Sequence, residues 1–201
     1  AYTDLTQGTA GYWDQVSDAQ DLTVSGEKTF TSSTLDTTKV YDDITITNGG
    51  TLKNSGTSSE IETIIVKGDI TINNGGNLTL STNDAHIAGF DLGTTGRPDD
   101  DKPETAVGTL YNKKDGILTI GSGTSNSYIQ LHSAVLESGS TTTINGSGAA
   151  TASQSTVGTA AYLFAGFGED PGKLEIQKGA TVEIKDFGYL GIASKGTMTI
   201  N

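Results

Sequence analysis

An eight-residue repeat runs through the last third of this 201-residue chain. Each repeat is an apolar-x-apolar triplet that follows a glycine-bearing break, and the triplets end at Ile176, Ile184, Ile192 and Ile200. Such a triplet places two side chains on one face of a short β-strand, while glycine favours a turn between strands. Strands and turns that alternate without a helical spacer are typical of a β-solenoid.

A longer interval supports a parallel coil. Isoleucines recur 24 residues apart at positions 120 and 144 and at 176 and 200, and 26 residues apart at 46 and 72. Asn-Gly-Gly turns at 48–50 and 74–76 separate some of the triplets, and Asn-Gly is also a signal for antiparallel hairpins. The interval of three repeats favours a coil with three short strands per rung, in which each strand stacks on its equivalent one rung away.

The composition limits the core and the partners. The chain is 33% hydrophobic and holds 27 glycines, which predicts a narrow core that successive rungs bury against one another. A net charge of -12 disfavours nucleic acid and anionic membrane surfaces as partners. No apolar run is long enough to insert into a bilayer, and the absence of cysteine rules out disulfides and thiol chemistry.

We therefore predict an all-β fold, a right-handed parallel β-helix that forms a single solenoid unit over residues 1–201. Residues 1–25, which hold the only tryptophan, are predicted to cap its first layer. Loop insertions are predicted at 82–113, where prolines flank an acidic run, and at 145–171, which is rich in glycine, alanine and serine before an aromatic stretch. The strand pattern continues to Asn201 without a polar cap, so we expect a fragment of a longer protein whose coil continues.

Three segments carry a resemblance to a known family. Asn-Gly-Gly-Thr-Leu at 48–52, Gly-Gly-Asn-Leu-Thr-Leu at 75–80 and Lys-Gly-Thr-Met-Thr-Ile at 195–200 resemble the repeats of bacterial autotransporter passenger domains. The resemblance implies a β-helical adhesin that is secreted or held at the bacterial cell surface through an outer-membrane translocator, which this sequence does not include. It also implies adhesion or self-association, as in biofilm formation or virulence, and it fixes no binding residue.

Residues suited to catalysis are few. His86 and His132 are explained by structural positions, and no nucleophile motif accompanies them. Asp99, Asp100 and Asp101 stand near Arg97 and would serve the alternative function, a carbohydrate-active β-helix enzyme such as a polysaccharide lyase or hydrolase. Consecutive aspartates point in different directions, however, which favours a solvated loop over a metal site. We assign the same solvated role to Asp42-Asp43 and Glu169-Asp170, and we expect no catalytic residue, metal or cofactor.

The leading hypothesis is therefore an adhesin fragment that does not catalyse a reaction. Its partners would be a host-surface protein or glycan, or further copies of itself, bound through a face of the coil or through the inserts. The expected ligand contacts are Tyr162, Phe164 and Phe167, because exposed aromatic rings offer a large contact area and suit sugar faces. The acidic run at 99–101 is a second candidate site. Burial of the three aromatic residues beneath the insert remains the alternative interpretation.

Overall fold

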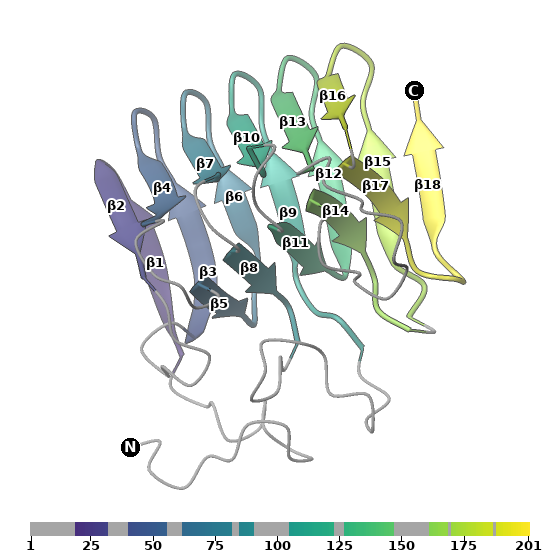
Figure 1. Ribbon diagram of the computed structural model, residues 1–201, viewed down its shortest axis with the longest axis horizontal. Coiled ribbons are helices and arrows are strands. Elements are labelled where there is room, and N and C mark those ends of the chain that lie inside the picture. The colour runs from purple at the N-terminus through teal and green to yellow at the C-terminus, as the bar shows by residue number, and fades with distance from the viewer. Residues whose placement is uncertain are drawn as a thin grey trace, which may run out of the picture.

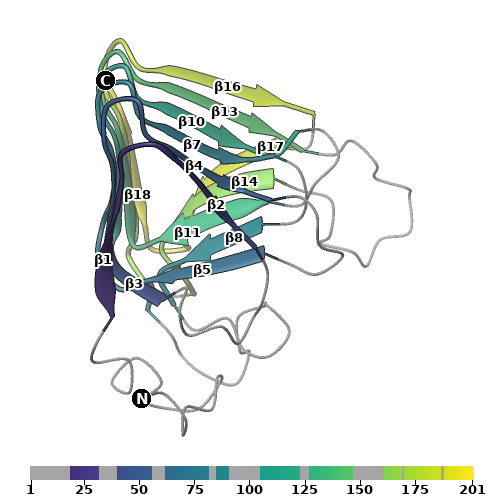
Figure 2. The same cartoon turned by 90° about the vertical axis from the view of Figure 1, so that its left-hand side faces the viewer.

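The computed structural model describes residues 19–31, 40–55, 62–81, 85–90, 105–122, 127–146, 161–168, 170–186 and 188–201. The only regular secondary structure in these residues is β-strand. The strands pair in parallel, and the strands of each sheet follow one another along one axis. The fold is a parallel β-helix, which confirms the predicted solenoid. Its axis runs across Figure 1, and Figure 2 shows the three sides of the coil almost end-on.

Three faces make up the coil. Face 1 contains β1 (Gln20–Val24), β3 (Val40–Ile46), β6 (Ile70–Ile72), β9 (Thr109–Asn112), β12 (Ser133–Leu136), β15 (Lys173–Ile176) and β18 (Thr197–Ile200). Face 2 contains β2 (Glu27–Phe30), β4 (Thr51–Asn54), β7 (Asn77–Leu80), β10 (Ile117–Ile120), β13 (Thr141–Asn145) and β16 (Thr181–Lys185). Face 3 contains β5 (Glu62–Val66), β8 (Ala85–Ala88), β11 (Tyr128–Leu131), β14 (Ala161–Ala165) and β17 (Gly188–Ile192). Faces 1 and 3 join at β3, which pairs with both β5 and β6.

The predicted intervals are register pairs of the coil. Ile46 lies beside Ile72 on face 1, and Ile176 lies beside Ile200 on the same face. On face 2, Ile120 lies beside Ile144. The four isoleucines of the eight-residue repeat fall in turn on β15, β16, β17 and β18, so three repeats complete one rung. The periodicity of the sequence therefore reports the winding of the chain directly.

Stacked turns join face 1 to face 2. The amide of Gly50 donates to the carbonyl of Thr47 at 2.8 Å, and the amide of Gly76 donates to that of Asn73 at the same distance. Gly49 and Gly75, the third residues of these turns, have φ of 76° and 71°. That backbone region favours glycine, which explains the Asn-Gly-Gly sequences. The amide of Gly49 also donates to Gly75 O at 3.1 Å, so each turn bonds to the next.

The interior of the coil is a thin column of aliphatic side chains. Each strand contributes the alternate residues that point inward, and one connected cluster of buried residues runs from β1 to β15. Ile44, Ile72, Leu80 and Leu110 are fully buried. In-register stacking lets like residues pack on like residues, so few apolar residues per rung suffice to form the core.

Parts of both predicted inserts belong to the coil, so the predicted boundaries are wrong there. The range 82–113 includes β8 and β9, and the range 145–171 includes β14; all three strands pair with neighbours on both sides. Each of these strands places only one Ile or Leu inside, since β8 and β14 otherwise use alanines and β9 also places Asn112 inside. Residues 1–18, 91–104 and 147–160, which hold most of the predicted cap and inserts, lie outside the described residues.

Candidate functional site

A stack of rings runs along the outer side of face 3. His86, Tyr128 and Tyr162 occupy equivalent outward positions on β8, β11 and β14 and are in register. The His86 and Tyr128 rings are stacked with centroids 4.0 Å apart, and the Tyr128 and Tyr162 rings are 4.6 Å apart and almost parallel, at 3°. Parallel strands repeat at about 4.8 Å, which lets flat rings at equivalent positions stack face to face. We call these three residues the aromatic column.

The first two members of the aromatic column are covered. His86 is 7% exposed and Tyr128 is 5% exposed, although both point away from the core of the coil. The Tyr128 hydroxyl is buried and has no hydrogen-bond partner among the residues that the structure describes. Burial, and secondarily the nearby Tyr162, raises the pKa of Tyr128 well above its ordinary value, because the phenolate would lie in a desolvated position.

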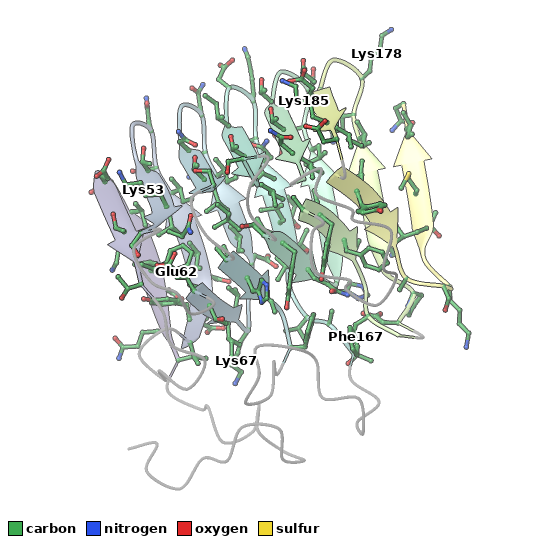
Figure 3. All side chains as sticks on the ribbon, in the orientation of Figure 1. Lys53, Glu62, Lys67, Phe167, Lys178 and Lys185 are labelled. Atoms are coloured by element: carbon green, nitrogen blue, oxygen red, sulfur yellow. The ribbon has the colours of Figure 1, made fainter. Side chains whose placement is uncertain are left out.

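A second apolar cluster covers this part of face 3. Phe90 is its largest fully buried side chain, and its ring packs on Phe167 with centroids 4.7 Å apart. Phe167 lies just beyond β14, at the lower edge of the coil in Figure 3. The buried members of this outer cluster are Val40, Ile65, Ala88, Phe90, Ala106 and Tyr128. The cluster lies outside the coil and stabilises segments that leave face 3.

Further along the axis the outer side of face 3 is more exposed, although Tyr162 still packs against the outer cluster. Tyr162 and Phe164 on β14 are half-buried, and their rings meet edge to face with centroids 6.4 Å apart. Tyr189 on β17 lies beside Tyr162 in the register and is 54% exposed. Phe164 lies over Gly191 of β17, so closely that a Cβ on Gly191 would be 2.7 Å from its ring. We call Tyr162, Phe164, Tyr189 and Gly191 the open patch.

The outer side of face 3 also differs from the other faces in charge. Strands β8, β11, β14 and β17 carry no Asp, Glu, Lys or Arg. Face 2, in contrast, has exposed ion pairs between Lys53 and Glu27 at 2.9 Å and between Lys185 and Glu183 at 3.0 Å. In a chain with a net charge of -12, the outer side of these four strands is thus an uncharged surface with several aromatic rings.

The predicted aromatic contacts have different positions from those expected. Tyr162 and Phe164 lie on a strand of the coil and not in a loop, and Phe167 is part of the outer cluster. One ring face of Tyr162 is already used by Tyr128. The sequence analysis missed Tyr189, because it pairs with Tyr162 at an interval of 27 residues (189 − 162), which differs from the intervals of 24 and 26 residues that the isoleucines mark.

The predicted carboxylate sites divide into described and undescribed residues. Asp99, Asp100 and Asp101 lie outside the described residues. The carboxylate of Asp43 accepts a hydrogen bond from the backbone amide of Asp69 at 2.7 Å. This bond links β3 to the next rung, because Asp69 directly precedes β6. Within the described ranges, no group of three His, Asp or Glu side chains is arranged to hold a metal ion. The same ranges contain no helix long and apolar enough to cross a membrane.

His132 and Asp170 form a hydrogen-bonded pair that the sequence analysis did not anticipate. His132 follows β11, and its Nδ1 lies 2.9 Å and 3.0 Å from the two carboxylate oxygens of Asp170. Asp170 is 6% exposed, so the expectation of a solvated carboxylate is wrong. A carboxylate that orients a histidine is one part of a catalytic triad. Among the described residues, however, no hydroxyl hydrogen-bonds to the His132 ring, and the pair joins the bend after β11 to the segment before β15.

Comparisons with known proteins add no further assignment. The chain matches no protein-family model, no curated protein and no solved structure. The aromatic column, the open patch and the His132–Asp170 pair are therefore interpreted from their own chemistry.

Proposed function

We propose that this chain is a binding module of the adhesin type that does not catalyse a reaction, and that its ligand-binding surface is the open patch on face 3. The observation that carries the proposal is the contrast in surface chemistry, since the outward positions of β8, β11, β14 and β17 are uncharged and several are aromatic, whereas face 2 bears ion pairs. Aromatic side chains that are already held in place offer contact area at a low entropic cost. A site for a charged ligand would carry charged side chains, and a catalytic site would bring a nucleophile and a base together.

From the resemblance to autotransporter passenger domains we infer that this module acts at a bacterial cell surface or in the secreted fraction. Its partner there would be a host-surface protein or glycan, or another copy of the chain. The rigid coil supports this role, because register hydrogen bonds hold β14 and β17 together and fix the spacing of Tyr162 and Tyr189. A preorganised surface loses little conformational entropy when it binds.

Binding of the purified chain to immobilised cell-surface glycans and proteins tests the proposal. Tyr189→Glu adds a charge to the open patch and is expected to reduce attachment at least tenfold. Tyr111→Glu on β9 is the matched control, because Tyr111 is a half-buried outward tyrosine on face 1. Equal loss in both variants, or no loss in either, would remove the open patch from the proposal. Turnover of an acidic polysaccharide by the purified chain would instead favour the enzyme alternative.

A further inference from the structure

The chain contains a single Asp–Pro peptide bond, and its aspartate is buried. Of the three prolines, only Pro171 follows an aspartate, Asp170. Asp170 is 6% exposed, whereas Pro171 lies at the surface. Asp–Pro is the peptide bond that acid splits most readily, because the aspartate carboxyl group lies within reach of its own main-chain carbonyl carbon and the tertiary nitrogen of proline is a good leaving group. The surroundings of this bond therefore decide how stable it is.

The segment that carries the bond, residues 166–172, is tied to the coil. The side-chain amide of Gln130 on β11 donates to Gly166 O at 2.7 Å. The amide of Asp170 donates to Phe167 O at 2.9 Å, and Phe167, which is labelled in Figure 3, packs against the outer cluster. A reacting group that its surroundings already hold in place needs little rearrangement before it can attack.

His132 orients the carboxylate of Asp170. The two carboxylate oxygens lie 2.9 Å and 3.0 Å from His132 Nδ1, and an N–H at this nitrogen donates to the carboxylate. Because the carboxylate is buried, water competes little for its oxygens. Attack by one of these oxygens on the main-chain carbonyl carbon of the same residue closes a five-membered ring. The buried pair thus holds a nucleophile next to its own peptide bond.

The carbonyl group of Asp170 is also polarised. The amide of Gly172 donates to Asp170 O at 2.8 Å, so a hydrogen bond spans Pro171. A bond from residue i+2 to residue i is that of a γ-turn, and the fixed φ of proline suits the central position of its inverse form. A donor aimed at a carbonyl oxygen stabilises the negative charge that develops there when the carbon is attacked. One turn therefore presents a polarised carbonyl group, an oriented carboxylate and a solvent-exposed leaving group.

We propose that the chain cleaves its own peptide bond between Asp170 and Pro171. A carboxylate oxygen of Asp170 bonds to the main-chain carbonyl carbon, the bond from that carbon to the Pro171 nitrogen breaks, and the nitrogen takes a proton from water. The product at Asp170 is a cyclic anhydride, which one water molecule opens to two carboxyl groups. His132 acts as a positioning residue. Each chain reacts once, so this self-cleavage goes beyond the proposed binding function and involves no turnover of a substrate.

The two products are expected to stay together. The fragment 171–201 contains β15, β16 and β17, which pair in register with β12, β13 and β14 of the fragment 1–170. These hydrogen-bonded strand pairs and the shared apolar core do not depend on the bond that breaks. Cleavage would therefore nick the coil between β14 and β15 without taking it apart.

Incubation of the purified chain at pH 6, followed by mass spectrometry and denaturing electrophoresis, tests the proposal. The expected products are the fragments 1–170 and 171–201, whose summed mass exceeds that of the intact chain by one water, while the size of the native particle is unchanged. The chain held unfolded in urea is expected to cleave about tenfold more slowly or less. Asp170→Ala removes the nucleophile and Pro171→Ala replaces the leaving group by an ordinary amide, so both variants are expected to stay intact.

Two substitutions at His132 separate positioning from a structural role. His132→Ala is expected to slow cleavage about tenfold or more, whereas His132→Asn keeps a side-chain N–H donor and is expected to retain most of the rate. Circular dichroism checks that both variants are folded. The proposal is overturned if the folded chain stays intact, if it cleaves no faster than the unfolded chain, or if Pro171→Ala yields the same fragments. Equal rates in the two His132 variants would remove His132 from the reaction.

Discussion

Two parts of face 3 have the same strand geometry but different surroundings. On β8 and β11 the outward rings of His86 and Tyr128 are buried, and Tyr128 is a member of the outer cluster, whereas on β17 the outward ring of Tyr189 is 54% exposed. Tyr162 lies between them and shares features of both, since one ring face is stacked and the side chain is half-buried. An aromatic residue at one register position therefore stabilises the fold where it is covered and offers a binding surface where it is not.

The strongest way to test this difference is to remove a ring from each part. Tyr128→Ala is expected to lower the free energy of unfolding by about 3–5 kcal/mol, because a large buried side chain with stacked neighbours on both sides leaves a cavity. Tyr189→Ala is expected to change it by less than about 0.5 kcal/mol, since the ring is mostly in solvent. Urea unfolding of both variants measures the two values. Similar losses of unfolding free energy in the two variants would show that burial of the outward ring does not distinguish the two parts of face 3.

Alkaline pH is expected to destabilise the covered part. Burial raises the pKa of Tyr128 well above 10.0, so the unfolded chain releases this proton at a lower pH than the folded chain does. The free energy of unfolding therefore keeps its full value below pH 10 and falls above it. The fall is about 1.4 kcal/mol for each pH unit over which Tyr128 stays protonated in the folded chain but not in the unfolded chain.

Tyr128→Phe isolates this effect. The hydroxyl has no hydrogen-bond partner among the described residues, so its removal is expected to leave stability at pH 7 unchanged or slightly higher. The variant should also lose less stability than the parent chain between pH 10 and pH 11. Unfolding curves at pH 7, 10 and 11 measure both quantities. An equal pH dependence in the two proteins would mean that Tyr128 ionises as readily in the folded chain as in the unfolded chain.

The features of the fold that sequence reasoning predicted are local or strictly periodic. The 24-residue separation of Ile120 and Ile144 survives because that rung contains no insert, and the φ of 76° at Gly49 follows from a short Asn-Gly-Gly signal. Rungs with inserts were harder to place. Leu78 lies beside Leu118, 40 residues later, so a search at a fixed interval does not align β7 with β10.

The open patch was only partly predictable for the same reason. Tyr162 and Phe164 were expected as ligand contacts from their aromatic character, but their strand was interpreted as a loop because its inward positions are Ala161, Leu163 and Ala165. Tyr189 enters the patch through its pairing with Tyr162 on the preceding rung, at an interval of 27 residues (189 − 162) that the isoleucine spacing does not mark. Whether an outward ring is covered depends on the outer cluster, to which Phe90 and Ala106 contribute from a separate excursion of the chain.

The smallest expected effect concerns the two glycines that lie beside face 3 in its covered and open parts. A Cβ on Gly89 would be 2.2 Å from the backbone carbonyl oxygen of Val107, which cannot move without disturbing a hydrogen-bonded segment. A Cβ on Gly191 would instead meet the outer edge of the Phe164 ring at 2.7 Å, and that ring can turn towards solvent.

Gly191→Ala is therefore expected to cost less than about 1 kcal/mol of unfolding free energy, while Gly89→Ala costs about 1–3 kcal/mol or more. Chemical denaturation gives the two costs, and a crystal structure of the Gly191→Ala variant would locate the Phe164 ring. A cost for Gly191→Ala that equals or exceeds that for Gly89→Ala would mean that Phe164 is held as rigidly as the covered rings. The boundary between the covered and the exposed part of face 3 would then lie between Phe164 and Tyr189, because a Phe164 ring that cannot turn aside is packed like the buried rings.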